Sequence, residues 1–328
     1  MKKLLLTTVL LAVSTAADAT PARMAALSGN SGFADDTDFF LYPSVLGGLI
    51  PRTMLTYNGA FDGGIIFDDG QALWFQRDSV ATDVAGLGPQ PGYRAVYAKG
   101  DGSTGYLLRA SQSGSDMSAN NNGTLTLGGA WSSGSGGSNP SNLAINGDLS
   151  VINNVTKDSM EIGINAGIGS RDLTEDKLVV WGAGLAYGAD VLTLSGGYTT
   201  GPRFRSDLAR VALQIGPLGA LSVNTDADVT TLGLSLPFSN LAAEYSLRDW
   251  IRLRGSATAS LLASTDLDDA LGNLSWGGGV GGAFGVGLIH EGARLDMAVN
   301  PDWVLAGPQF LSGTANQMFA TVTARVDL

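Results

Sequence analysis

The feature that most constrains this sequence is a series of short segments in which apolar residues alternate with small or polar ones. In residues 160–168, for example, Met160, Ile162 and Ile164 share one face, whereas Glu161 and Asn165 fall on the other. A period of two residues is typical of a β-strand with one apolar face. No apolar run reaches the ~18 residues that a transmembrane helix needs. The pattern therefore predicts an all-β chain.

Alternation alone is compatible with a soluble sandwich as well as with a membrane barrel. Here large residues dominate one face while Gly, Ala, Ser or charged residues occupy the other, which suits a lipid face and a narrow or wet interior. Aromatic residues recur near segment ends, as interfacial girdles require: Tyr57, Trp74, Tyr106, Trp131, Trp181, Tyr187, Tyr198, Tyr245 and Trp250. We therefore predict a transmembrane antiparallel up-and-down β-barrel over residues 51–328, with roughly 14 strands and a range of 12–16.

Turn signals separate the expected strands. Tight turns are predicted at Asn58-Gly59, Asp69-Gly70, Asp101-Gly102, Asn122-Gly123 and Asn146-Gly147, because Asn and Gly tolerate the positive φ that such turns need. Residues 258–273 and 300–317 are expected to be long external loops. Short periplasmic turns are expected at Arg248-Asp249, at His290-Glu291 and within residues 201–207.

The last segment, residues 318–328, is the most specific barrel signal. Met318, Ala320, Val322, Ala324, Val326 and Leu328 share one face, and Thr323 and Arg325 are among the residues on the other. An apolar residue that ends such a strand resembles the signal read by outer-membrane assembly machinery, which is the expected partner together with the outer-membrane bilayer. Most proteins with this signal end in Phe or Trp rather than Leu.

The first 19 residues are typical of a secretory signal peptide. Lys2-Lys3 are followed by the apolar stretch Leu4–Val13 and by the small-residue site Ala17-Asp18-Ala19, with cleavage expected after Ala19. Removing them takes away two Lys and one Asp, so 17 basic and 29 acidic residues remain (19 − 2 and 30 − 1), a net charge of -12. That balance makes nucleic-acid binding improbable. The absence of Cys is compatible with passage through an oxidising periplasm.

Residues 20–50 lack clear alternation and are expected to form an N-terminal periplasmic or plug segment. Within it, the run from Ala34 to Pro43 resembles a segment found early in FadL-type outer-membrane transporters and their PorV-like relatives, with Tyr42 and Ser44 where that superfamily has Asn and Ala. The resemblance implies a plugged barrel of roughly 14 strands whose hydrophobic cargo leaves through a gap in the wall. The plug candidates are Asp35, Asp36, Asp38, Phe39, Phe40 and Pro43.

Charged residues opposite the apolar faces are expected to point into the lumen, since an Arg aimed at lipid costs ~2–4 kcal/mol at the bilayer midplane. They are Arg94, Arg109, Glu161, Arg210, Glu244, Arg248, Arg252, Arg254, Arg294, Asp296, Arg325 and Asp327. They form either an ion-pair network that fills and stiffens the lumen or a charged constriction that selects permeants. The acidic plug residues are expected to lie near inner arginines.

Three other patterns have plain structural interpretations. The glycine run 277–282 contains Gly-x-Gly-x-x-Gly, but the alternation around it predicts a strand and not the helix that a dinucleotide site needs. His290 lies in an expected surface turn without a nucleophile motif, so no catalytic residue, and no enzyme, is predicted. Asp266, Asp268 and Asp269 lack EF-hand spacing and are expected in an acidic external loop, so no metal or cofactor is predicted.

The sequence leaves three functions open. The first is a FadL-like transporter in the cell outer membrane that passes small hydrophobic or amphipathic molecules through a plugged barrel. The second is a structural or scaffolding barrel that anchors partners through residues 119–123 and 131–146. The third is a general diffusion porin. A segment lodged in the lumen would favour the first.

Overall fold

A computed structural model describes residues 20–27, 30, 32–33, 36–57, 61–80, 90–113, 123–134, 141–154, 159–174, 176–188, 191–216, 220–226, 229–235, 238–266, 275–299 and 320–328. The expected signal peptide, Asp35 and the expected loop at 300–317 lie outside these residues. Three short helical elements precede the strands: α2 (Pro21–Ala26) and the 3₁₀ helices η1 (Asp36–Phe40) and η2 (Pro43–Gly48).

The strands form one continuous antiparallel sheet. The first nine are β1 (Arg52–Tyr57), β2 (Phe61–Ile66), β3 (Gln71–Val80), β4 (Gln90–Gly100), β5 (Thr104–Ser113), β6 (Gly123–Gly134), β7 (Ser141–Asn154), β8 (Ser159–Leu173) and β9 (Lys177–Gly188). The others are β10 (Val191–Arg205), β11 (Ala209–Gly216), β12 (Ala220–Asp226), β13 (Val229–Ser235), β14 (Phe238–Arg248), β15 (Ile251–Asp266), β16 (Ser275–His290), β17 (Ala293–Val299) and β18 (Ala320–Asp327).

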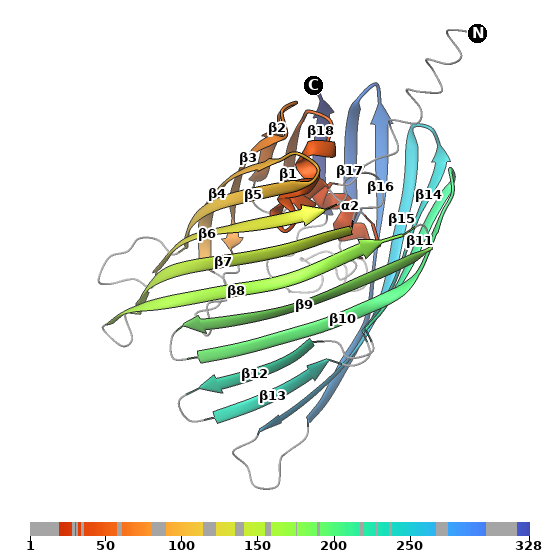
Figure 1. Ribbon diagram of the computed structural model, residues 1–328. Coiled ribbons are helices and arrows are strands. Elements are labelled where there is room, and N and C mark those ends of the chain that lie inside the picture. Colours follow the sequence, from red (N-terminus) through yellow and green to blue (C-terminus); the bar gives the residue numbers. More distant parts are fainter. Residues whose placement is uncertain are drawn as a thin grey trace, which may run out of the picture.

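The sheet closes on itself because β1 pairs with β2 on one side and with β18 on the other. The predicted all-β transmembrane-type barrel is thus confirmed in its fold (Figure 1). β10 pairs with β12 through residues 192–197 and with β11 through several residues between 200 and 205. β11 and β12 therefore share one position in the wall, as do β13 and β14 beside β15, so a circuit crosses 16 strands, against an expected number of roughly 14.

The outward face is apolar, as the alternation predicts. Ile162, Leu108 and Leu127 are 61%, 60% and 60% exposed, while their sequence neighbours point inward. Soluble monomers seldom expose contiguous apolar surface on this scale, whereas the lipid face of an outer-membrane-type barrel requires it. Of the nine aromatic residues expected at the membrane interfaces, Trp74 alone is buried inside; the other eight lie on the outer face or an exposed turn. Trp74 lies between the exposed Leu73 and Phe75, and so its side chain points inward.

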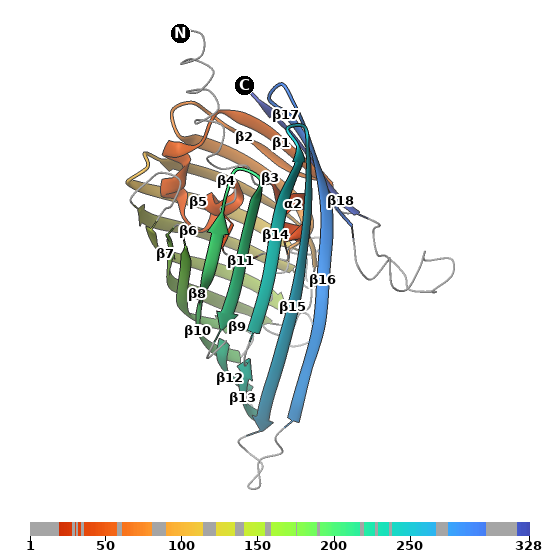
Figure 2. The same cartoon turned by 90° about the vertical axis from the view of Figure 1, so that its right-hand side faces the viewer.

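The long connections, those after β3, β5, β15 and β17, lie at one end of the barrel, and we call the opposite end the short-turn end. The connections after β2, β4, β8, β10, β14 and β16 contain no more than four residues each. The C-terminus lies at the same end, where Leu328 N donates to Pro51 O at 3.0 Å. Both Figure 1 and Figure 2 place the helical turns of residues 20–50 inside this end of the barrel.

Some turn predictions are wrong. Asn146-Gly147 lies inside β7, where Asn146 pairs with Gly167 of β8, and its side chain lies over the space that a Cβ on Gly167 would fill. β10 runs to Arg205, so the turn expected within 201–207 is confined to residues 206–208. β15 runs to Asp266, into the segment expected to be a loop. Pairing along both neighbouring strands explains these extensions, which local turn residues do not reveal.

Candidate functional site: a filled barrel lumen

The helix α2 is held against the inner wall by a buried ion pair. Thr20 caps the helix by accepting from Arg23 N at 3.3 Å, and Pro21 begins it. Arg23 donates to Glu244 of β14 from Nε at 2.7 Å and from Nη2 at 3.2 Å. Both side chains are almost fully buried, at 1% and 3% exposure. A buried pair with two hydrogen bonds fixes the position of α2 strongly, since loss of either partner strands a charge.

The Arg23–Glu244 pair belongs to a larger network on β14–β17. Arg254 lies 2.7 Å from Glu244 and 2.7 Å from Asp296. Asp296 also pairs with Arg294 at 2.7 Å and accepts from the hydroxyl of Thr20 at 2.7 Å. The charges of this network thus alternate in sign from the helix across neighbouring strands, in the order Arg23, Glu244, Arg254, Asp296 and Arg294. This arrangement corresponds to the ion-pair network interpretation of the inner charges.

The next stretch of the N-terminal segment packs on the adjoining part of the wall, from β14 to β8. Leu27 and Phe33 form an apolar cluster with four wall residues on β8, β9, β11 and β14: Leu173, Leu178, Ala212 and Ala242. Between them, the amide of Asn30 donates to the backbone oxygens of Ala212 at 3.1 Å and of Asn240 at 2.8 Å. This stretch therefore bridges two neighbouring wall strands.

The chain then reaches the barrel seam, where β1 meets β18. Asp36 accepts from Arg52 Nη1 at 2.9 and 2.8 Å and from Arg325 Nη1 at 3.3 Å. Burial raises the pKa of Asp36, and the two arginines oppose that rise. The expected pairing of an acidic plug residue with an inner arginine is thus present at Arg325. Arg325 also bonds Asp327 at 2.9 Å.

A second acidic residue of η1 contacts the far wall. Asp38 accepts from Arg171 Nη2 of β8 at 2.7 Å. The guanidinium of the same arginine lies 4.9 Å from the ring centroid of Tyr42, a cation–π distance. Residues 36–42 thus join β1 and β18 to β8 across the lumen.

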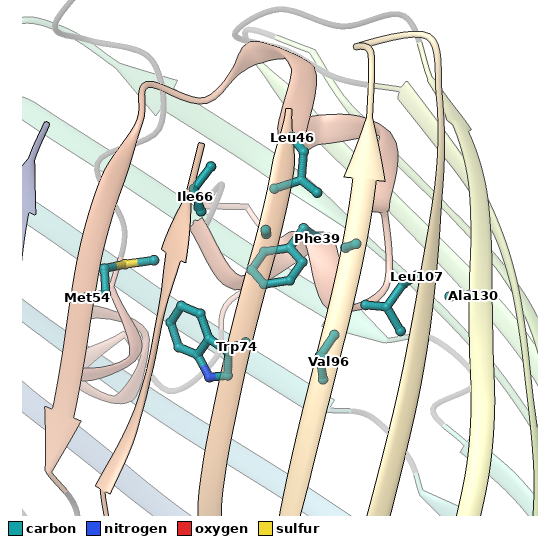
Figure 3. Packing of buried hydrophobic residues seen from close by; sticks show 10 residues of the cluster. Phe39, Leu46, Met54, Ile66, Trp74, Val96, Leu107 and Ala130 are labelled. Carbon is teal, nitrogen blue, oxygen red and sulfur yellow. The ribbon is translucent and has the colours of Figure 1, made fainter. Parts of the chain in front are cut away.

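The two 3₁₀ helices cover an apolar cluster on the inner faces of β1–β6 (Figure 3). Phe39 and Leu46 are fully buried, and both contact this cluster. The wall residues of the cluster are Met54, Ile66, Ala72, Trp74, Val96, Ala98, Leu107 and Ala130. The ring of Trp74 packs edge-on against Phe39 and Phe40 at 5.9 and 5.6 Å between centroids. Burial of Phe39 and Leu46 stabilises this seat by ~1.5–3 kcal/mol per side chain.

Glycines let η2 approach the wall closely. A Cβ on Gly105 of β5 would lie 2.3 Å from the backbone of Pro43, so only a glycine fits there. Gly102 N in the β4–β5 turn donates to Ser44 O at 3.0 Å, and Ser44 N donates to the hydroxyl of Ser132 at 2.9 Å. The predicted plug residue Pro43 is thus seated on β4–β6.

The remaining inner charges lie on other parts of the wall, except that Arg210 and Arg252 lie beside the Arg23–Glu244 pair. Arg109 bonds Asp148 of β7 from Nε at 2.6 Å, with 18% and 13% of the two side chains exposed. Arg94 lies near Gln76 at 3.5 Å, and Glu161 is partly buried on β8. Arg210, Arg248 and Arg252 occupy the short-turn ends of β11, β14 and β15.

Sequence reasoning missed four charged residues that hold the segment or pair in the lumen: Arg23, Arg52, Asp148 and Arg171. Arg52 shares the inner parity of Met54 and Thr56, so extending the alternation two residues upstream would have found it. Arg23 carries no such signal, because α2 is shorter than two helical turns.

The other singled-out patterns behave as surface or wall features. His290 ends β16 with its side chain 85% exposed, 3.9 Å from Glu291. The glycine run lies within the strand β16 and not before a helix. Asp266 ends β15, while Asp268 and Asp269 lie outside the described residues. Within the described ranges, no group of three or more His, Cys, Asp or Glu side chains could hold a metal ion.

Across the part of the chain that the structure describes, no helix has the length and apolar character needed to cross a membrane.

Seven solved protein chains are similar to this chain in structure. One of them is described as a bacterial polysaccharide outer membrane secretin, with 9% sequence identity and a TM-score of 0.38, covering 85% of this chain and 98% of that one. No family model matches the sequence, and no curated protein matches it.

Proposed function

We propose that the protein is an outer-membrane channel that passes small hydrophobic or amphipathic molecules and whose short-turn end is closed by residues 20–50. One observation carries the proposal: this segment contacts strands around nearly the whole circuit of the wall. Its anchors reach β14 through Arg23, β1 and β18 through Asp36, and β8 through Asp38. A segment that touches opposite walls obstructs the lumen between them.

The outer face supports the location. An apolar belt such as that formed by Ile162, Ile164 and Leu149 is stable only against lipid. Together with the expected signal peptide, it favours insertion into the outer membrane by the barrel assembly machinery, with the short turns in the periplasm. In this proposal the protein is not an enzyme and uses no cofactor.

A low part of the wall supports the FadL-like exit of cargo towards lipid. The neighbouring strands β17, β18, β1 and β2 have 7, 8, 6 and 6 residues, whereas β15 and β16 have 16 each. Six residues extend ~20 Å along a strand, which at a tilt of ~40° is ~15 Å of height against an apolar band of ~25 Å. Figure 1 shows how far β15 and β16 extend beyond these four strands.

A specific observation also favours the scaffold alternative. Leu27, Phe39 and Leu46 are fully buried, so releasing all of residues 20–50 exposes apolar side chains at ~1.5–3 kcal/mol each. Release of the segment also separates the buried ion pairs Arg23–Glu244 and Asp36–Arg52. A barrel closed this firmly would suit a structural anchor as well as a gated channel.

Ion conductance in planar lipid bilayers tests the proposal. We expect the full-length protein to be mostly closed, and deletion of residues 25–42 to produce steady large openings. The double variant Arg23→Gln/Asp36→Asn should open intermittently, because both buried anchors are lost. The matched control, Lys99→Gln/Asp249→Asn, changes exposed charges at the same end and should stay closed.

The outcomes separate the three functions. If the full-length protein conducts like an open porin and the deletion changes nothing, the porin function replaces the proposal. If every variant stays closed, the scaffold function does. If the deletion opens the pore, uptake of a fluorescent alkyl-chain probe into vesicles, compared with a sugar of equal size, tests the hydrophobic cargo.

A further inference from the structure

A row of outward-facing side chains near the short-turn end combines a cation with aromatic rings. Lys99 of β4 lies directly opposite Tyr106 of β5, and Tyr106 lies opposite Trp131 of β6. Tyr106 and Trp131 are 45% and 43% exposed, and Lys99 is exposed beside them. We call these three residues the interfacial row, and Figure 1 shows their strands side by side. The row places one ammonium group and two amphipathic rings at a single depth on the lipid face.

Hydrogen bonding and ring packing hold the aromatic part of the row in place. The hydroxyl of Tyr97 on β4 donates to Oε1 of Gln71 on β3 at 3.0 Å. The ring of Tyr97 lies 6.2 Å from that of Tyr106 between centroids. This surface is therefore ordered before a ligand arrives, which reduces the entropy lost on binding.

Two donors of the row are not used by the fold. Within the described residues, Lys99 forms no ion pair and the indole N–H of Trp131 forms no hydrogen bond. Both groups lie at the edge of the apolar outer face, at the level where aromatic side chains meet lipid headgroups. They are therefore available to an acceptor supplied by the membrane.

The side chains around the row form layers along these strands. On the hydrocarbon side lie Leu73 and Leu108, which are 50% and 60% exposed. On the other side lie exposed carboxylates of the β2–β3 and β4–β5 turns: Asp68, Asp69 and Asp101. These carboxylates are separated from the level of the row by about two residues, which span ~7 Å along a strand. From the hydrocarbon outwards, the order is therefore apolar, basic and acidic.

We propose that the interfacial row and the turn carboxylates bind a zwitterionic phospholipid, one whose glycerol-linked phosphate is followed by a primary ammonium group. The phosphate lies over Tyr106, within reach of Lys99 and of the Trp131 N–H, because neighbouring strands are only ~4.8 Å apart. The ammonium group of the lipid binds the turn carboxylates, and its acyl chains pack on the leucines below. The proposal rests on the proposed membrane location but not on conductance.

The turn carboxylates decide between zwitterionic and anionic lipids. Asp68 has no hydrogen bond or ion pair among the residues that the structure describes, so it is available to an ammonium group. Asp101 accepts from Ser103 N at 2.8 Å and from Thr104 N at 2.7 Å, which fixes its carboxylate at the turn. A lipid with phosphate alone satisfies Lys99 but is repelled by these carboxylates, since like charges oppose binding.

Native mass spectrometry of the full-length protein tests the site. The protein is released from neutral detergent with phosphatidylethanolamine and phosphatidylglycerol of identical acyl chains, and we expect it to retain the first lipid preferentially. Lys99→Gln should reduce retained phosphatidylethanolamine roughly threefold, as expected for one exposed charge contact. The matched control Lys177→Gln removes the same charge from the outer face at the same end, opposite Pro202 and not an aromatic residue, and should retain lipid like wild type.

A second variant tests the ammonium contact. Asp68→Asn should lower retention of phosphatidylethanolamine and raise that of phosphatidylglycerol, because it removes a group that distinguishes the two lipids. Asp249→Asn in the exposed β14–β15 turn is its control and should leave the preference unchanged. Unchanged circular dichroism of all four variants excludes misfolding as the cause.

Three results would overturn the proposal. The first is a wild-type protein that retains both lipids equally or prefers phosphatidylglycerol. The second is equal weakening by Lys99→Gln and Lys177→Gln. The third is a dimer that Lys99→Gln dissociates, because a second copy of the chain and not lipid would then cover the row.

Lipid retention and ion conductance separate this site from the channel. Selective retention of phosphatidylethanolamine by a protein whose variants all stay closed in planar bilayers would uphold the site and remove the channel. Conductance after deletion of residues 25–42, without any lipid preference, would uphold the channel and remove the site.

Discussion

Residues 20–33 and residues 36–50 share one lumen, but different interactions hold them. The first half, which contains α2, is fixed by the Arg23–Glu244 pair and by the hydroxyl of Thr20 on Asp296. The second half, which contains η1 and η2, covers the large apolar cluster on β1–β6 and adds the Asp36–Arg52 pair. Directional contacts dominate the first half and buried area dominates the second.

The difference follows from what each part of the wall offers. Inner faces of β14–β17 carry charged residues such as Glu244, Arg254 and Asp296, so only a segment with matching polar groups can fill the space beside them. Inner faces of β1–β4 carry Met54, Trp74 and Val96 and accept aromatic side chains. Because polar anchoring depends on geometry and apolar anchoring on area, the halves should be separable by substitution.

The largest effect should come from truncating Phe39 and Leu46, which fill the apolar cluster on β1–β6. Phe39→Ala/Leu46→Ala leaves a cavity beside Trp74, and the expected destabilisation of the second half is roughly 5 kcal/mol or more. Hydrogen exchange should then show rapid exchange of amides in residues 36–50, with residues 20–27 still protected. This result would show that the halves are separate units.

The matched control is Leu73→Ala/Phe75→Ala on β3. These side chains point to lipid on either side of Trp74, so the seat of Phe39 stays intact. Loss of protection in both halves of the Phe39→Ala/Leu46→Ala protein would mean that residues 20–50 unfold as one unit, and the comparison would fail.

Glu244→Gln should release the first half while the second half stays bound, and the loss of stability should be slightly smaller. It removes the carboxylate shared by Arg23 and Arg254 while keeping the side-chain shape. Removing one partner of a buried ion pair costs ~3–5 kcal/mol, so the free energy of unfolding in urea should fall by that amount. Exchange should now be rapid in residues 20–27 and slow in residues 36–46.

Glu291→Gln in the exposed β16–β17 turn is the control and should leave the free energy of unfolding unchanged. If Glu244→Gln changes the free energy of unfolding as little as this control does, the ion-pair network only fills the lumen, and the inference that polar contacts anchor α2 is wrong.

The wall was more predictable from the sequence than the lumen contents. Period-two alternation is a local property, so the faces of Ile162, Ile164 and Trp181 followed directly. The number of strands did not, because β11–β14 divide two wall positions into four short segments. That division depends on which strands pair, a non-local property.

The anchors were predictable only in part. Asp36 beside Arg325 followed from opposite charge on the plug and on a strand of known parity. Arg23 with Glu244 joins residues 221 positions apart through a single helical turn and had no local signature. Trp74 was assigned to the membrane interface from its residue type, although the parity of its neighbours places it inside.

Both halves pack on the inner face of the wall, and the assignment of that face rests on the alternation of side chains along each strand. A substitution on the lipid face tests this assignment. Ile164→Arg should destabilise the barrel by ~2–4 kcal/mol, because it puts a charge into hydrocarbon. Asn165→Arg, one residue along β8 and facing the lumen, should cost much less. Folding titrations in lipid vesicles measure both, and equal losses would mean that the faces or the membrane assignment are wrong.

The smallest effect concerns the turn on which η2 rests. Backbone hydrogen bonds from Thr104 and Ser103 lower the pKa of Asp101 below 3.8, and Gly102 N donates to Ser44 O from the same turn. Because the folded pKa lies below the unfolded one, ionised Asp101 stabilises the turn above pH 3.8, and this contribution is lost as pH falls through the folded pKa. Amide resonances of Gly102 and Ser44 should therefore shift together in that acidic window, while those of α2 stay constant. Asp101→Asn should abolish the shift and Asp249→Asn should preserve it. If α2 resonances move together with Ser44 in the wild type, the two halves are coupled through the lumen even by a change this small.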